Sequence, residues 1–272
     1  MISYPNAKIN LGLNILRKRE DGFHEIESVF YPVPWNDILE IVPQKAGRGE
    51  VTFTSSGIEI PSNGGLNLCE QVFNLLHEQY NLPSVNIHLH KQIPIGAGLG
   101  GGSADAAFAA VMLNDMFELK LSEAELEDLV SKVGSDCPFF VRNKPSRVTG
   151  RGEILAPFDL DLTGYWIVLV NPNIHIKTEE AYAGITPSEP VFSPWLYLME
   201  DVYDWKNCLK NDFEDSIFPN HPEIENLKTQ LYSFGADYAA MTGSGSTVFG
   251  LFENEPKEMM FSDSYSTKIE RL

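Results

Sequence analysis

The chain has 272 residues, 43% of them hydrophobic and 21% charged, which is the composition of an ordinary globular enzyme. Its 20 Lys and Arg against 38 Asp and Glu give a formal net charge of −18 at pH 7, which opposes binding to nucleic acid or to an anionic membrane. Three widely spaced cysteines, no signal-peptide pattern and no apolar run of bilayer length predict a reducing, cytoplasmic compartment.

Strands and helices are predicted in an irregular order along the chain. Alternating apolar residues predict strands at 7–17, 38–43 and 85–90, and a continuous apolar run predicts a buried strand at 165–170. Two further strand-like segments lie at 239–242 and 248–252. Apolar residues at helical spacing predict helices at 67–80, 103–117, 122–134 and 223–231. A charged turn with Asp-Gly at its centre occupies 17–24. Because strict βαβ alternation is missing, we predict an α+β fold, divided into residues 1–157 and 158–272.

The most informative segment runs from Pro94 to Asp105, where five glycines fall within seven residues between a predicted strand and a predicted helix. Glycine allows positive φ angles and a close approach of the backbone to a ligand. We expect Ser103 to cap the helix that follows. The unpaired N–H groups and the partial positive charge at a helix start bind phosphate. The segment therefore predicts a phosphate or nucleotide site built from backbone.

Other interpretations of this glycine-rich segment remain open at this point. A Walker P-loop is excluded because Ser103-Ala104, and not Lys-Ser or Lys-Thr, follows Gly102. Residues 96–101 match the GxGxxG pattern of dinucleotide-binding turns. That pattern, however, starts about 95 residues into the chain, and no strand with an acidic tip follows. A purely structural turn without a ligand is the third possibility.

Two charged side chains could take part in catalysis. Asp136 follows a predicted helix end and precedes Pro138 in apolar surroundings, where a carboxylate could accept a hydroxyl proton. The alternative is an ordinary Asx turn before the proline. Lys8 lies between Ala7 and Ile9 in an alternating strand, and it is either a site residue or a solvated strand lysine.

A second short turn of glycines and hydroxyl residues lies at 242–247, and it is either a hairpin turn or a further source of phosphate donors. His88 and His90 share one face of a predicted strand, but no third metal ligand is evident, so we interpret them as strand histidines. His24 lies in the charged turn at 17–24, where loops commonly carry binding residues.

Together these segments resemble the superfamily of galactokinase, homoserine kinase, mevalonate kinase and phosphomevalonate kinase. Pro94–Ser103 resembles its second motif, Thr242–Ser246 its third and the N-terminal strand its first. Within it, AKINL at 7–11, DGFH at 21–24 and GSDCP at 134–138 are most similar to the family of 4-diphosphocytidyl-2-C-methyl-D-erythritol kinases.

The resemblance implies a two-domain α+β small-molecule kinase fold with its active site in the cleft between the domains. It also implies transfer of the ATP γ-phosphoryl group, with Mg²⁺, to the 2-hydroxyl of a cytidyl-diphospho sugar alcohol. By position, Asp136 is the general base and Lys8 its partner, Asn67 and Lys91 lie near the adenosine, and Ser103 lies near Mg²⁺. The ATP phosphates would be held by Pro94, Gly96, Ala97, Gly98, Leu99, Gly100, Gly101, Gly102, Ser103, Ala104, Gly243 and Ser244.

The acceptor site is assigned by the same resemblance. Asn10 and His24 would contact the acceptor, Phe23 and Tyr182 would sandwich the cytosine, and Thr178 would lie beside the ribose or the diphosphate. Phe23 stands where many members of the family carry tyrosine. Small molecules are therefore the expected partners, with no nucleic acid and no membrane.

Overall fold

The computed structural model describes residues 1–45, 47, 49–61, 64–257 and 259–272, which form two compact units. The first unit consists of Met1–Ala7, Trp35–Ile95 and Gly100–Lys144, and the second of Lys8–Pro34, Gly96–Leu99 and Pro145–Leu272. Packing thus interleaves segments of the chain, because Lys8–Pro34 and Gly96–Leu99 pack with the C-terminal part. The division expected after residue 157 stays a prediction.

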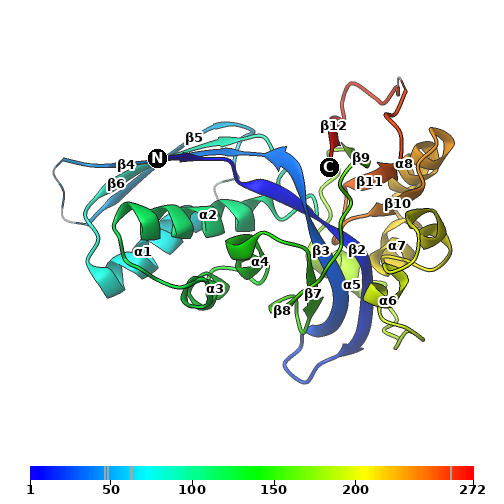
Figure 1. The fold of residues 1–272 in the computed structure, drawn as a ribbon, viewed down its shortest axis with the longest axis horizontal. Coiled ribbons are helices and arrows are strands. Elements are labelled where there is room, and N and C mark those ends of the chain that lie inside the picture. Colours follow the sequence, from blue (N-terminus) through cyan, green and yellow to red (C-terminus); the bar gives the residue numbers. More distant parts are fainter. Residues whose placement is uncertain (46, 48, 62–63, 258) are drawn as a thin grey trace. The chain divides into compact units, whose positions relative to one another are not determined.

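The first unit is a sheet covered by helices (Figure 1). Its four strands follow the order β1 (Ile2–Ser3), β4 (Ile38–Pro43), β6 (Val85–Lys91) and β5 (Val51–Gly57). β4 and β6 are antiparallel, with Ile38 opposite His90, whereas β5 runs parallel to β6. The helices are α1 (Leu68–Tyr80), α2 (Gly101–Met116), α3 (Glu123–Ser131) and α4 (Cys137–Arg142).

The core of this unit lies between the sheet and helices α1 and α2. Leu39 and Ile41 from β4 and Ile87 from β6 pack with Phe73 from α1 and with the alanines of α2. Alanine is the best helix former and has the smallest side chain that keeps a Cβ, so α2 forms readily and packs closely on its neighbours. The capping boxes of Asn67 on α1 and Ser122 on α3 fix where these helices begin.

The second unit contains two further sheets (Figure 1). One follows the order β2 (Asn6–Lys18), β3 (His24–Asn36), β7 (Ser146–Thr149) and β8 (Ile154–Pro157). The other follows the order β10 (Tyr238–Met241), β11 (Val248–Phe252), β9 (Trp166–Asn171) and β12 (Ser266–Arg271). The accompanying helices are α5 (Thr178–Ala183), α6 (Pro194–Tyr197), the 3₁₀ helix η1 (Val202–Asn207), α7 (Phe213–Ile217) and α8 (Pro222–Ser233). Helix α8 packs its buried Ile224, Leu227 and Leu231 on the second of these sheets.

The predicted mixture of strands and helices is confirmed. The strands expected at 38–43 and 248–252 have these bounds, and the helices expected at 67–80 and 223–231 end within about two residues of theirs. Long strand β3 was not predicted, because Pro32 and Pro34 interrupt its pattern. No helix in the described ranges has both the length and the hydropathy needed to cross a bilayer.

Candidate active site

The glycine-rich segment leads directly into helix α2. Gly96, Gly98 and Gly100 adopt φ angles of 65°, 77° and 70°, a region that favours glycine. Gly100 is the N-cap of α2, and no side chain caps the first turn of this helix in the structure. A helix start of this kind can offer its first backbone N–H groups to an anion, and the phosphate site expected here stays a prediction.

The expectation that Ser103 caps this helix is wrong. Helix α2 begins at Gly101, two residues earlier, because Gly100 makes the left-handed turn and its carbonyl already accepts the N–H of Ala104. Ser103 therefore lies inside the first turn, where its half-buried hydroxyl forms a hydrogen bond with the Cys137 thiol. Burial raises the pKa of that thiol to about 12, so Cys137 stays a neutral neighbour of Ser103.

The glycine segment and the turn at 242–247 pack together within the second unit. A Cβ on Gly98 would lie 2.0 Å from the carbonyl oxygen of Thr242, which no residue but glycine accommodates. The Thr242 hydroxyl donates to the Gly98 carbonyl at 3.2 Å, and the N–H of Thr247 donates to Ala97 at 3.3 Å. The turn joins β10 and β11, as in the hairpin interpretation, and it also fixes the backbone at Ala97 and Gly98.

Lys8 is a buried residue of strand β2, so the alternative of a solvated strand lysine is wrong. Its side chain is 3% exposed, and its ammonium donates to the Asn10 side-chain oxygen at 2.6 Å and to the Gly98 carbonyl at 3.1 Å. The ammonium also lies 4.5 Å from the centre of the Phe30 ring. These contacts hold one positive charge beside the glycine segment.

A hydrogen-bond network behind Lys8 fixes the orientation of the Asn10 amide. The Asn10 side-chain nitrogen donates to the Ser28 hydroxyl at 2.9 Å, and that hydroxyl donates to the Gly12 carbonyl at 2.6 Å. With its nitrogen directed to Ser28, Asn10 presents its oxygen to Lys8. Asn10 is 2% exposed and its side-chain oxygen accepts from Lys8, whereas the contact with the acceptor that the resemblance implies stays a prediction.

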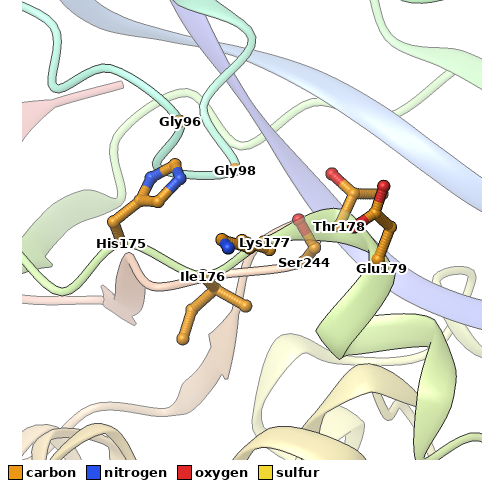
Figure 2. Close-up of a pocket in the computed structure, with 8 residues that line it drawn as sticks. All are labelled: Gly96, Gly98, His175, Ile176, Lys177, Thr178, Glu179 and Ser244. Carbon is orange, nitrogen blue, oxygen red and sulfur yellow. The ribbon is translucent and has the colours of Figure 1, made fainter.

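A pocket beside the glycine segment has two walls (Figure 2). Gly96 and Gly98 form one wall with Ser244, and the segment that enters α5 forms the other. Of these lining residues, the sequence indicated Gly96, Gly98, Thr178 and Ser244. It missed the remaining four, which are His175, Ile176, Lys177 and Glu179. Nothing in the order of the chain relates residues 175–179 to the glycines at 96 and 98.

The aromatic residues assigned to the cytosine make a different contact from the expected sandwich. Tyr182 of α5 stacks on His24, with ring centres 4.5 Å apart and planes 13° apart. Burial, helped by the charge of Lys18, lowers the pKa of His24, which favours the neutral ring. Phe23 is 54% exposed, and the Arg151 guanidinium lies 4.8 Å from its ring centre.

Lys91, expected near the adenosine, is enclosed by carboxylates in the first unit. Its ammonium forms a short ion pair with Asp37 and lies 2.8 Å from Asp105 of α2. Burial acts to lower the pKa of Lys91, but the two carboxylates together raise it above its ordinary value. Asp37 also accepts the N–H of Ile93 at 2.9 Å, so this cluster ties the end of β6 to α2.

The other residues expected in the first unit lie at helix ends. Asp136 is the half-buried N-cap residue of α4, but its side chain makes no capping bond to that helix, which leaves the Asx-turn interpretation unsupported. Asn67 caps α1 by accepting the N–H of Cys69 at 2.9 Å. Helix α4 itself was not predicted, because six residues are too few for a periodic pattern.

Within the described part of the chain, no group of three or more His, Cys, Asp or Glu side chains is arranged to hold a metal ion. Mg²⁺ is commonly bound through one or two side chains plus substrate phosphates, and it retains several waters. Such a mode needs only a few oxygen donors, such as the Ser103 hydroxyl at the start of α2.

Comparison with known proteins assigns the chain to one family. Residues 67–144 match the model described as the GHMP kinases N terminal domain, and residues 197–259 match the GHMP kinases C terminal model. A protein of Cytophaga hutchinsonii named 4-diphosphocytidyl-2-C-methyl-D-erythritol kinase is 54% identical over 94% of both chains. A protein of the same name from Bacteroides fragilis is 49% identical, also over 94% of both.

The fold is similar to solved structures as well. A crystal structure of a 4-(cytidine 5'-diphospho)-2C-methyl-D-erythritol kinase covers 94% of this chain and 91% of its own, with a TM-score of 0.79 and 30% identity. A homoserine kinase from Cytophaga hutchinsonii covers 97% and 93%, with a TM-score of 0.66 and 12% identity, which indicates a shared fold alone.

Proposed function

Because this chain belongs to the 4-diphosphocytidyl-2-C-methyl-D-erythritol kinases of the GHMP kinase superfamily, we propose that it transfers the γ-phosphoryl group of ATP to the 2-hydroxyl of that cytidyl diphosphate sugar alcohol. One observation carries this function, namely that identity of 54% extends over 94% of both this chain and its relative. Both substrates are small molecules, and the reaction is a step of non-mevalonate isoprenoid biosynthesis. We further predict that it takes place in the cytoplasm.

Asp136 and Lys8 are the proposed catalytic residues. The Asp136 carboxylate accepts the proton of the 2-hydroxyl as the oxygen attacks the γ-phosphorus, and ADP leaves with the electrons of the broken P–O bond. The Lys8 ammonium stabilises the negative charge that develops on the attacking oxygen. Burial of Lys8 and its fixed hydrogen bond to Asn10 support this role, because a preorganised charge needs little rearrangement during the reaction.

The glycine segment and the start of α2 are proposed to hold the ATP phosphates. Support comes from the left-handed glycines, from the uncapped first turn of α2 and from the third-motif turn that fixes Gly98. Mg²⁺ bound to ATP would supply charge neutralisation of the phosphates, and Ser103 is the side chain we expect beside it. Asn67 and Lys91 stay our prediction for the neighbourhood of the adenosine.

Recognition of the cytosine is proposed for Phe23 in the turn before β3, for His24 at the start of β3 and for Tyr182 of α5. The stacked pair of His24 and Tyr182 offers flat faces, and Phe23 lies exposed in the same charged turn as His24. Stacking of one base on an aromatic ring contributes about 1–3 kcal/mol. A kinase whose acceptor lacks a nucleobase has no need of such rings, so they distinguish this function from that of a homoserine or mevalonate kinase.

A comparison of acceptors tests the proposal. Release of ADP would be measured with ATP, Mg²⁺ and the purified protein, using the cytidyl diphosphate substrate, mevalonate or homoserine as acceptor. We expect turnover with the cytidyl substrate alone. Turnover with another acceptor would be consistent with the proposed phosphate site but would contradict the assignment of Phe23, His24 and Tyr182 to the cytosine. ATP binding without any turnover would instead indicate a non-catalytic nucleotide-binding homologue.

A further inference from the structure

The pocket of Figure 2 contains two basic side chains that the proposed reaction has not yet used. His175 and Lys177 come from the segment between β9 and α5, and they face Gly96, Gly98 and Ser244. This wall and the glycine wall thus carry different donors, since one offers an imidazole and an ammonium and the other offers backbone and a hydroxyl.

His175 packs directly against the glycine segment. A Cβ on Gly96 would lie 3.2 Å from both Cε1 and Nδ1 of the His175 ring, so the missing side chain of Gly96 is what admits the imidazole. The close approach ties the second wall to the first within the same unit. The imidazole of His175 therefore lies directly beside the backbone that is proposed to hold the ATP phosphates.

Lys177 is exposed at this pocket and brings a positive charge that has no ion-pair partner among the described residues. Among the described residues, none of the carboxylates lies within ion-pairing distance of its ammonium. The neighbouring acids are directed elsewhere or stay exposed, since Glu180 bonds His221 at 2.8 Å and Glu179 lines the pocket as an exposed side chain. In a chain of net charge −18, a free ammonium beside backbone donors attracts an anion locally.

The position of the pocket indicates which anion it takes. Thr178 lines the pocket as the first residue of α5, and Tyr182 stacks on His24 four residues further along the same helix. A rise of 1.5 Å per residue separates these two positions by about 6 Å along the axis. A nucleoside diphosphate can extend over that distance with its base at the aromatic pair and its phosphates in the pocket.

We propose that His175 and Lys177 form a phosphoryl-anion subsite that binds the diphosphate of the cytidyl acceptor. The identity of the acceptor rests on the proposed function. The charge and the geometry of the subsite are independent of that function. The ATP phosphates share the same chemistry, so the experiment must separate these two sources. Lys177 and His175 are binding residues here and take no part in proton transfer.

Steady-state kinetics of Lys177→Met and His175→Gln test the subsite. Loss of a charge-assisted hydrogen bond should raise the KM for the cytidyl acceptor about tenfold in Lys177→Met and further in the double variant. The KM for ATP should stay within about twofold of the wild-type value. Lys177→Arg keeps the charge and should restore most of the affinity for the acceptor.

Lys132→Met is the matched control, because Lys132 is half-exposed and its ion pair is the surface contact with Asp128 at 3.3 Å. It removes the same charge without touching the pocket, and it should leave both KM values unchanged. A rise in the KM for ATP in Lys177→Met, with no change for the acceptor, would assign the pocket to ATP and overturn the proposal. Unchanged KM values for both substrates would overturn it as well.

A direct titration separates this inference from the proposed function. Inorganic pyrophosphate would be titrated calorimetrically into the wild-type protein and into Lys177→Met, with neither substrate present. Weaker binding to Lys177→Met than to Lys132→Met supports the subsite even if the cytidyl acceptor proves not to be phosphorylated. Equal binding to these two variants, or no binding to the wild type, overturns it.

Discussion

The side-chain oxygen of Asn10 lies 2.6 Å from the ammonium of Lys8, and the Asn10 nitrogen is held at 2.9 Å by the hydroxyl of Ser28. Because an amide has one oxygen and one NH₂ group, the bond to Ser28 determines that the oxygen faces Lys8. The charge of Lys8 is thus placed by a residue that is itself 2% exposed. Two buried strand residues, Asn10 and Ser28, thus set the position of one proposed catalytic group.

Replacing Asn10 should therefore slow catalysis without weakening ATP binding. In Asn10→Ala the buried ammonium loses a charge-assisted hydrogen bond, and we expect kcat to fall about 10- to 100-fold. Steady-state kinetics would measure the fall in kcat. Ser28→Ala, which frees the Asn10 amide to rotate, should have a smaller effect. An unchanged kcat in a folded Asn10→Ala protein would refute the positioning role.

Asp136→Asn should abolish most of the turnover. An amide keeps the shape of the carboxylate but cannot take the hydroxyl proton, so we expect kcat to fall at least about 100-fold. ATP affinity, measured by calorimetry, should stay close to the wild-type value. Turnover similar to the wild type would show that Asp136 is not the base.

Tyr182 should contribute to acceptor binding through its ring. Tyr182→Ala removes a stacking surface of about 1–3 kcal/mol, so the KM for the cytidyl substrate should rise at least about fivefold while that for ATP stays constant. Tyr182→Phe is the control that keeps the ring and its contact with His24, so its KM for the cytidyl substrate should rise far less than that of Tyr182→Ala. Equal effects of Tyr182→Ala on both KM values would remove the cytosine assignment.

Gly98→Ala should damage both folding and the phosphate site. The new methyl group would lie 2.0 Å from the Thr242 carbonyl at a φ of 77°, so we expect a loss of more than about 1 kcal/mol in the free energy of unfolding. Thermal melting would measure this loss of stability. Gly65→Ala, with no atom within 4 Å of the added carbon, is the matched control and should melt like the wild type.

Asp105 should make stability depend on pH. Burial raises the pKa of Asp105 from 3.8 to about 7. Between pH 3.8 and about 7 the folded state therefore keeps a proton on Asp105, whereas the unfolded state has lost it. The favourable contribution of the protonated form is complete below pH 3.8 and is lost as the pH rises toward 7. Melting temperatures of wild type and Asp105→Asn should therefore converge at low pH. As the pH rises through this window, the wild type should lose melting temperature relative to the variant. A constant difference across the window would contradict this.

The sequence determined the local features of the proposed phosphate site. Five glycines before an alanine-rich segment indicated a backbone site at a helix start, and α2 begins there with left-handed glycines before it. The capping boxes at Asn67 and Ser122 are local features as well, because each joins residues three apart in the chain. The same local information placed the start of α2 two residues late, since Gly101 and Gly102 are poor helix formers that tertiary packing nevertheless holds in the helix.

Only the tertiary structure determined which side chains meet. Lys8 looked like a solvated strand lysine by itself, because alternation gives the face of a strand but not what covers that face. Its partner Gly98 is 90 residues away, and Thr242 reaches Asn10 across 232 residues. His175 and Lys177 belong to no sequence motif, and only their position beside Gly96 and Gly98 in the structure indicates a role for them. Contacts between distant segments depend on how sheets and helices stack, which local patterns do not encode.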